Sequence, residues 1–343
     1  MGETDDSNTK GDRLGGAQLS DCFARAVGDD RVGAGGADQV DLGGGVCGPD
    51  VDLVAAFVSA RHDVRIELHG PQAWAGEREA LHAEATRQWS ALHDALGKAG
   101  AAIETVAPEP GLPDLVFTAN AAVVLDRKAL LARFRHPERQ SEQPVFAAGF
   151  RALQARGLID ELIEMPQGIP LEGAGDCLWD RARGQFWMGC GFRSDAAAAR
   201  VVEAVFGAPC LGLELADPSF YHLDTALCAL PCGAVIYYPG AFSGPALELI
   251  HRHVAAEDRI VLSQADAARF AANAVCVGRV IVLSSCSGEL RRVLEQRGYT
   301  VVETPLHAFL RSGGSACCLT LRLDHVSDVA RADVSRAAQR VTA

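Results

Sequence analysis

Apolar residues recur at helical spacing in two stretches of the chain. In the first, residues 81–96, they fall three or four positions apart, and the "GKAG" that follows is typical of a helix end. In the second, residues 195–207, an aspartate precedes an apolar stripe, and aspartate is a preferred residue at a helix start. The spacing therefore predicts one helix over 81–96 and another within 195–207. The apolar positions of the first are Leu81, Ala85, Trp89, Leu92 and Leu96.

Shorter apolar runs predict strands. Residues 225–238 hold two such runs separated by Pro-Cys-Gly, which is the pattern of a hairpin. Residues 115–125 have the composition of a strand interrupted by polar side chains. From residue 259 onward strands and helices alternate. We expect strands at 259–263, 279–285, 299–306 and 316–323, and helices from Asp266, from Gly288 and over 307–312.

The alternation of strand and helix indicates an α/β protein, but the hairpins do not fit a purely parallel sheet. The units recur every 40–60 residues or so, which hints at a repeat architecture without an apparent residue-level repeat.

The first 50 residues differ from the rest. They are rich in glycine and aspartate and hold few large apolar side chains, so they cannot bury enough surface to offset their chain entropy. We expect a disordered tail over 1–50 and a single ordered domain over 51–335.

Charge and cysteine content narrow the class of protein. The net charge is −12 and no Lys/Arg-rich block is present, which disfavours nucleic acid and anionic membranes as partners. The sequence holds no apolar run long enough for a membrane span and no secretory signal near its start. Its 11 cysteines are scattered without a CxxC pair, which favours reduced thiols in the cytoplasm.

Four polar clusters interrupt otherwise apolar segments, at 113–120, 171–176, 220–228 and 313–318. Polar groups in such places cost free energy unless they are paired or used. In the third cluster His222 and Asp224 are two residues apart, so on a strand they would share one face. Histidine is the side chain best suited to proton transfer near neutral pH. A capped core histidine beside a solvated aspartate is the simpler alternative.

Two other clusters carry groups of the same chemistry. Glu172 precedes three small residues and could hold an imidazole in one tautomer, although an exposed glutamate at a glycine turn fits as well. Cys317 and Cys318 follow a glycine pair, and on a strand they would face opposite ways, so only one could point at His222. Two packed thiols are the alternative.

Arg139 and Arg193 are candidate clamps for a carboxylate, because a guanidinium pairs with a carboxylate through two hydrogen bonds. Single arginines more often lie on a solvated surface.

Taken together, these clusters resemble the motifs of the pentein superfamily of guanidino-group-modifying enzymes, over roughly residues 75–325. The superfamily includes arginine deiminases, dimethylarginine dimethylaminohydrolases, arginine dihydrolases and amidinotransferases. "GGSACCLT" resembles its nucleophile motif, "YHLDT" its His-x-Asp motif, and "LEGAGD" its Glu-Gly-Gly-Asp motif with one extra residue. "GFRSD" resembles the segment whose arginine binds the substrate's α-carboxylate, and the four motifs occur in the family's order.

The resemblance implies a role for each of these residues. Cys318 would be the nucleophile, His222 the acid and base, and Glu172 the group that orients His222. The substrate-binding residues would be Asp224 for the guanidinium and Arg193 for the α-carboxylate, with Arg139 and Asn120 beside them. Deiminases usually carry aspartate where this chain has Asn120, and in the arginine dihydrolase branch an asparagine there is linked with hydrolysis beyond citrulline to ornithine.

The implied fold is a five-bladed α/β propeller with pseudo-fivefold symmetry and a central active site. The implied activity is hydrolysis of the guanidino group of arginine or a methylated arginine through a covalent cysteine intermediate. No cofactor and no metal are implied; the partner is a small guanidino substrate, and a homo-oligomer is compatible with it. An amidinotransferase or a non-catalytic binding protein of the same fold are the alternatives.

Overall fold

The computed structural model of the chain describes residues 74–327. The predicted tail at 1–50 lies outside these residues, and the predicted domain at 51–335 extends beyond them at both ends. No helix in the described part of the chain is both long and apolar enough to cross a membrane.

Four three-stranded sheets organise the described residues, and each follows the same plan. Two antiparallel strands form a hairpin, and a third strand, reached through a helical connection, lies parallel to the second. The strands are β1 Ala122–Leu125, β2 Lys128–Leu131 and β3 Glu161–Glu164; β4 Cys177–Asp180, β5 Gln185–Cys190 and β6 Cys210–Glu214; β7 Leu227–Ala229, β8 Val235–Tyr237 and β9 Arg259–Val261; β10 Val275–Val277, β11 Val280–Leu283 and β12 Thr300–Glu303.

The helices lie between the strands and outside them. One long helix, α2 Trp74–Lys98, packs against α10 His307–Leu310 and against β11. The others are α3 Pro137–Gln140, α4 Glu142–Ala155, α5 Gly173–Asp176, α6 Ala198–Phe206, α7 Gly244–His253, α8 Gln264–Ala267 and α9 Gly288–Gln296. Short 3₁₀ helices cover Pro113–Val116, Thr118–Ala121, Pro218–Phe220, Leu223–Thr225, Pro239–Ala241 and Ala256–Asp258.

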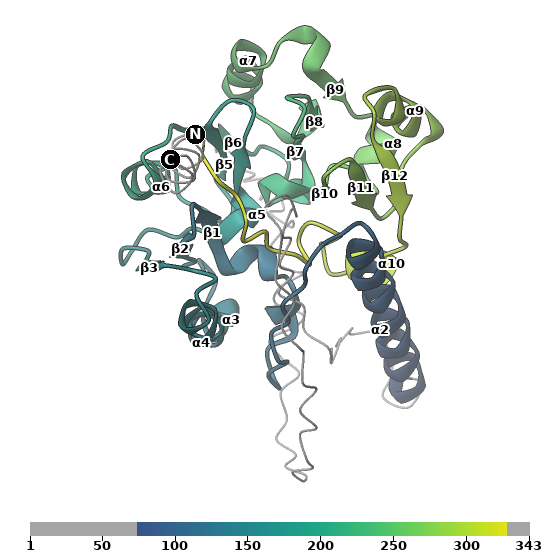
Figure 1. The fold of residues 1–343 in the computed structure, drawn as a ribbon. Coiled ribbons are helices and arrows are strands. Elements are labelled where there is room, and N and C mark those ends of the chain that lie inside the picture. Colours follow the sequence, from purple (N-terminus) through teal and green to yellow (C-terminus); the bar gives the residue numbers. More distant parts are fainter. Residues whose placement is uncertain (1–73, 328–343) are drawn as a thin grey trace, which may run out of the picture.

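The four sheets surround a common centre in chain order, with α2 and α10 between the fourth sheet and the first (Figure 1). Their buried faces form apolar clusters that join each sheet to its helices. In every unit the segment before the first strand reaches the centre: α5 precedes β4, and the turn Leu223–Thr225 precedes β7. The repeat therefore delivers residues that are distant in sequence to one place.

Most predicted elements are confirmed. The predicted helix at 81–96 lies within α2, and Ala85, Leu92 and Leu96 are buried as the spacing requires. The hairpin at 225–238 is the antiparallel pair β7 and β8. The strands predicted from 259 to 306 are β9, β11 and β12, and α6, α8, α9 and α10 match the predicted helices within a few residues.

Two strand predictions are wrong in whole or in part, those for 316–323 and 115–125, and the strand geometry considered for His222 and Asp224 is not found either. All three segments lie at the centre. Residues 316–323 form a turn followed by irregular chain, because Leu319 N bonds back to Ser315 O at 3.1 Å and Thr320 N to Cys317 O at 2.9 Å. His222 and Asp224 lie at and within a 3₁₀ turn. Of residues 115–125, only the last four form a strand, and 3₁₀ turns precede it. In each case tight main-chain turns replace the pleat that alternating apolar residues suggested.

Candidate active site

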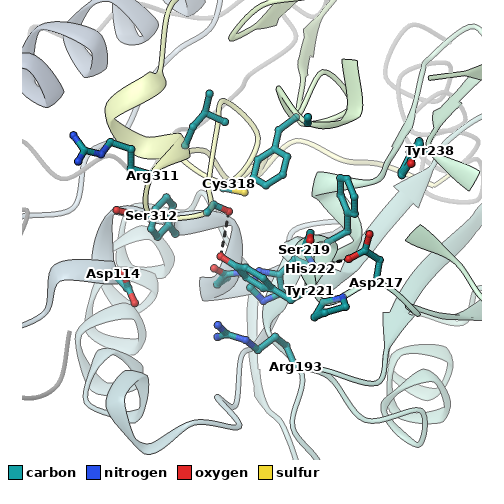
Figure 2. A pocket seen from close by; sticks show the side chains of 18 of the residues that line it. Asp114, Arg193, Asp217, Ser219, Tyr221, His222, Tyr238, Arg311, Ser312 and Cys318 are labelled. Carbon is teal, nitrogen blue, oxygen red and sulfur yellow. Dashed lines mark hydrogen bonds between the residues drawn. The ribbon is translucent and has the colours of Figure 1, made fainter. Parts of the chain in front are cut away.

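A cavity of about 560 Å³ opens at the centre, and it has both Cys318 and His222 in its wall. Figure 2 shows Cys318 on the C-terminal turn, with His222, Tyr221 and Arg193 grouped across from it. Asn120, Arg139 and Asp114 line the same cavity. The sequence-predicted nucleophile and acid/base thus come together from segments almost 100 residues apart.

The imidazole of His222 is held by a buried carboxylate. Its Nε2 lies 2.8 Å from Oε2 of Glu172, which is fully buried. The guanidinium of Arg193 reaches the same oxygen at 3.3 Å. Burial alone raises the pKa of Glu172, but the hydrogen bond and charge of His222 and the positive charges of Arg193 and Arg139 outweigh it and lower this pKa to about 2. An ionised carboxylate only accepts, so Nε2 carries a proton and Nδ1 is the nitrogen that can take up another.

A second buried carboxylate fixes the backbone around this pair. Asp176 accepts from Leu223 N at 3.0 Å and from the hydroxyl of Ser194 at 2.6 Å, and Ser194 Oγ accepts from Glu172 N at 3.0 Å. The segments that carry Glu172, Arg193 and His222 are therefore tied to one side chain. Its position in the "LEGAGD" cluster gave no indication of this role.

The thiol of Cys318 lies against Asp224. Its Sγ is 3.1 Å from Oδ2 of Asp224, and both residues are buried. The other oxygen, Oδ1, is buried and has no hydrogen-bond partner among the described residues. Burial raises the pKa of Asp224 to about 7, and burial together with the negative charge of Asp224 raises the pKa of Cys318 well above its usual value. A cation placed here would reverse both effects.

Cys317 has a different environment from its neighbour. It is absent from the cavity wall, which Cys318 lines, and it packs partly buried against the apolar cluster to which Cys318 also belongs. The two thiols therefore do face different surroundings, although a turn and not a strand separates them. Burial raises the pKa of Cys317 well above its usual value, which suits a packing role.

The glycine pair before these cysteines lets the turn approach its neighbours. Gly313 has φ +80°, and a Cβ there would lie 2.2 Å from the hydroxyl of Tyr221, which donates to Gly313 O at 3.1 Å. A Cβ at Gly314 would lie 2.2 Å from the ring of Phe117. Only glycine fits at either position without displacing a residue of the cavity wall.

The two arginines predicted to bind a carboxylate differ in their surroundings, since one faces the cavity and the other is paired with a buried glutamate. Arg193 lines the cavity with its guanidinium stacked 4.6 Å above the Tyr221 ring. Arg139 is buried, pairs with both oxygens of Glu142 at 2.9 and 2.7 Å, and donates to Asn120 Oδ1 at 2.8 Å. Burial by itself lowers the pKa of Arg139, but Glu142 more than compensates and raises it. Arg139 therefore positions Asn120; its role as a carboxylate clamp stays a prediction.

Asn273 was missed by the sequence analysis, although it contacts the nucleophile. It is fully buried and donates from Nδ2 to Cys318 Sγ at 3.0 Å. A signal was present: "FTANA" at 117–121 and "FAANA" at 270–274 are a short internal repeat. Both copies precede the first strand of a sheet, β1 and β10, and both phenylalanines line the cavity.

Hydrogen bonds join the central segments of successive units into a closed ring. The pairs are Ala119 N with Cys318 O (3.2 Å), Asn120 Nδ2 with Glu172 O (3.1 Å), Leu223 N with Asp176 Oδ1 (3.0 Å), Asn273 Nδ2 with Asp224 O (3.0 Å) and Cys318 N with Asn273 Oδ1 (3.1 Å). Five segments, each distant from the next in sequence, thus form the floor of the cavity.

The described residues contain no group of three or more His, Cys, Asp or Glu side chains placed to hold a metal ion. Every cysteine that the structure describes is a free thiol.

Comparison with known proteins gives the family. A family model described as N,N dimethylarginine dimethylhydrolase, eukaryotic, matches residues 68–324. The chain belongs to this family. The resemblance to guanidino-modifying enzymes that the motifs indicated is thereby confirmed.

Curated relatives come from two branches. A bifunctional arginine dihydrolase/ornithine cyclodeaminase, AgrE, of Nostoc is 43% identical over 251 residues, which are 73% of this chain and 35% of the relative. The chain thus spans about a third of the length of that relative. An N(G),N(G)-dimethylarginine dimethylaminohydrolase of Mycobacterium tuberculosis is 37% identical over 70% of this chain and 76% of its own length.

A solved structure of the N-terminal domain of ArgZ, a cyanobacterial arginine dihydrolase, superposes with a TM-score of 0.72. It is 36% identical, and the match covers 80% of this chain and 99% of that one; the domain is a cysteine-to-serine mutant bound to substrate. The mixed α/β fold of the family is therefore shared.

Proposed function

We propose that the chain hydrolyses the guanidino group of arginine or of a methylated arginine, with Cys318 as nucleophile. The observation that carries the proposal is the pairing of a buried thiol with a buried carboxylate that has one unpartnered oxygen, facing an imidazole across a cavity. A planar cation with several N–H donors satisfies that oxygen and neutralises the charge that disfavours the thiolate. The relatives described above are named for arginine dihydrolase and dimethylarginine dimethylaminohydrolase activity, and both activities are hydrolysis of a guanidino group.

In the proposed mechanism the substrate guanidinium lies against Asp224 and lowers the pKa of Cys318. The thiolate attacks the central guanidino carbon, and His222 gives a proton to the departing amine, which is ammonia or a methylamine. The covalent amidino-thioether remains. His222, which no longer carries a proton on Nδ1, takes one from a water molecule as that water attacks the same carbon. The bond between this carbon and the Cys318 sulfur then breaks, and citrulline is released as the product.

Glu172 keeps the imidazole in one tautomer and compensates its charge when it is protonated. Arg193, on the cavity wall, is placed to receive the substrate carboxylate. Asn120, anchored by Arg139, would hold the ureido group for a second hydrolysis to ornithine, carbon dioxide and ammonia.

We further propose that the fold is a five-bladed propeller whose fifth unit combines the C-terminal turn with an N-terminal segment. Four sheets with one plan and a ring of five central segments support it. The single catalytic domain would then extend over 51–335, as expected from the sequence.

Product analysis tests the function. Purified protein is incubated with arginine and, separately, with asymmetric dimethylarginine, and citrulline, ornithine, ammonia and methylamines are measured by mass spectrometry. We expect consumption of at least one substrate, abolished in Cys318→Ser. Added glycine distinguishes a transferase, because it would yield a new guanidino product. If the folded protein consumes neither substrate, the proposed function is wrong.

A further inference from the structure

Asn273 has no role in the proposed mechanism, although it lies in hydrogen-bond contact with the sulfur of Cys318. Three hydrogen bonds define its position: Nδ2 donates to Cys318 Sγ at 3.0 Å and to Asp224 O at 3.0 Å, and Oδ1 accepts from Cys318 N at 3.1 Å. The residue is fully buried. It therefore contacts the sulfur, the main chain of the nucleophile and the main chain of the carboxylate beneath it.

The orientation of this amide follows from its partners. A backbone N–H can only donate and a carbonyl oxygen can only accept, so Oδ1 must face Cys318 N and Nδ2 must face Asp224 O. One hydrogen of Nδ2 is then committed to Asp224 O, and the other points at Sγ. The sulfur accepts this bond and directs its own proton toward Asp224 Oδ2 at 3.1 Å.

The turn that carries Asn273 contains a bulky residue in a left-handed backbone conformation. Phe270, three residues earlier, has φ +54°, a left-handed conformation that is strained for a bulky side chain. Asn273 N bonds back to Phe270 O at 2.9 Å, which closes the turn. The strain is retained where it aims the amide at the sulfur and places the Phe270 ring in the cavity wall.

We propose that Asn273 is a catalytic residue that holds the Cys318 sulfur in its attacking position and stabilises its thiolate. When the thiol proton passes to water in the cavity, the sulfur anion keeps the Nδ2–H donor, and a donor to a charged acceptor is about twice as strong as one to a neutral acceptor. The main-chain N–H of Ser315 favours the thiolate in the same sense. This inference rests on the proposed function only in naming Cys318 as the nucleophile.

Other groups also act on the ionisation of this thiol. Asp224 and Cys317 oppose it, and the remaining charged or titratable groups in the cavity wall are Asp114, Arg139, Arg193, Asp217, Tyr221, His222, Tyr238 and Arg311. A substitution at Asn273 leaves all of these side chains in place, but it also removes the hydrogen bond through which Asn273 lowers the pKa of Asp224. A less ionised Asp224 opposes the thiolate less, so an upward shift of the thiol midpoint reports the lost donor.

Alkylation of the substrate-free protein provides the test. Iodoacetamide is added between pH 6 and 10.5, and the rate of labelling of Cys318 is followed by peptide mass spectrometry. Asn273→Asp removes the donor and keeps the shape, whereas Asn273→Ala removes the donor without adding a charge. We expect both to shift the midpoint of the pH–rate profile upward by about one unit, and to lower the labelling rate at pH 8 by about tenfold.

The matched control is Arg269→Ala, in the same turn, whose side chain is half exposed and 3.8 Å from Asp266. It should leave the profile unchanged. Folding is checked in each variant by thermal unfolding and by protection of the buried thiols of Cys177 and Cys210. If either folded Asn273 variant has the midpoint of the unmodified chain, the residue is only structural and the proposal is wrong.

Steady-state kinetics provide a second test, with whichever of arginine and dimethylarginine the product analysis shows to be consumed. We expect kcat to fall by at least about tenfold with KM changed less than threefold, since the amide touches the sulfur and lies beneath the cavity floor. If the chain consumes neither arginine nor dimethylarginine, the alkylation profile still reports on Asn273. Failure of the proposed function is thus separable from failure of this inference.

Discussion

The two buried carboxylates of the site have opposite ionisation behaviour. Glu172 is fully buried yet has a pKa of about 2, whereas Asp224, equally buried, has a pKa of about 7. Burial raises the pKa of both. The difference lies in their partners. Glu172 has the side chains of His222 and Arg193 within 3.3 Å. Asp224 has the thiol of Cys318 against its carboxylate, and its main-chain oxygen accepts a hydrogen bond from the side-chain amide of Asn273.

This contrast indicates a division of labour across the cavity. On the side of His222, the negative charge of Glu172 is compensated by side chains of the protein itself. The geometry and charge of this side are therefore set before any ligand binds. The thiol side carries a carboxylate whose ionised form is stable only beside a cation. In the proposed mechanism, a substrate without a positive charge would leave Asp224 protonated and the Cys318 thiol un-ionised, so the proposed reaction would be restricted to cationic substrates.

The strongest test of the contrast is Asp224→Asn. The substitution keeps the shape and removes the carboxylate that lies against Cys318 and, in the proposed mechanism, against the substrate guanidinium. We expect kcat/KM to fall about 10³-fold or more, because losing one partner of a buried charge pair costs about 3–5 kcal/mol. Steady-state kinetics at pH 7.5 give the ratio. A loss below tenfold would mean that Asp224 does not bind the cation.

Glu172→Gln probes the opposite side. The amide can still accept from His222 Nε2, but it no longer compensates a positive imidazole. We expect kcat to fall by about 10²-fold with little change in the alkylation of Cys318 by iodoacetamide, since the thiol side is untouched. Equal losses of turnover and of thiol reactivity would show that the two sides are not independent.

The smallest expected effect concerns stability and pH. The pKa of Asp224 is raised from 3.8 in a free chain to about 7 in the folded protein, so the folded state binds this proton more tightly. The contribution of Asp224 to the free energy of unfolding is therefore fully present below pH 4, and it is lost as the pH rises toward 7. Asp224→Asn should therefore melt at the same temperature as the unmodified chain at pH 4 and about 2–6 °C higher at pH 8.

Calorimetry of the two proteins across this range measures the difference. A constant offset in melting temperature would indicate that packing, and not ionisation, separates them.

The sequence predicted the periphery of the fold better than its centre. Apolar spacing identified α2 and the β7–β8 hairpin, because burial of one face determines both patterns. It misassigned residues 316–323 and the first part of 115–125 as strand, since a tight turn lined by small apolar residues has the same composition as a strand. Glycine positions such as Gly313 and Gly314 marked the turn but not its course.

The site residues with charge or nucleophilic character were predictable in type, and the structure brings Cys318, His222, Glu172 and Asp224 together. Asn273 and Asp176 were not predicted. Each acts through hydrogen bonds to a backbone or side chain about 50 residues away, and no local pattern encodes such a distant partner. Only the repeated F-x-A-N-A letters could have drawn attention to Asn273.

The ring of central hydrogen bonds also determines when in its synthesis the protein acquires a reaction centre. The acid/base pair is complete once residue 222 has left the ribosome, but its thiol comes almost 100 residues later and must insert between Ala119 and Asn273. Until that last segment docks, a nascent chain has Glu172, His222 and Asp224 but lacks Cys318, the proposed nucleophile. Catalytic competence is thus a late event, and it coincides with closure of the circle.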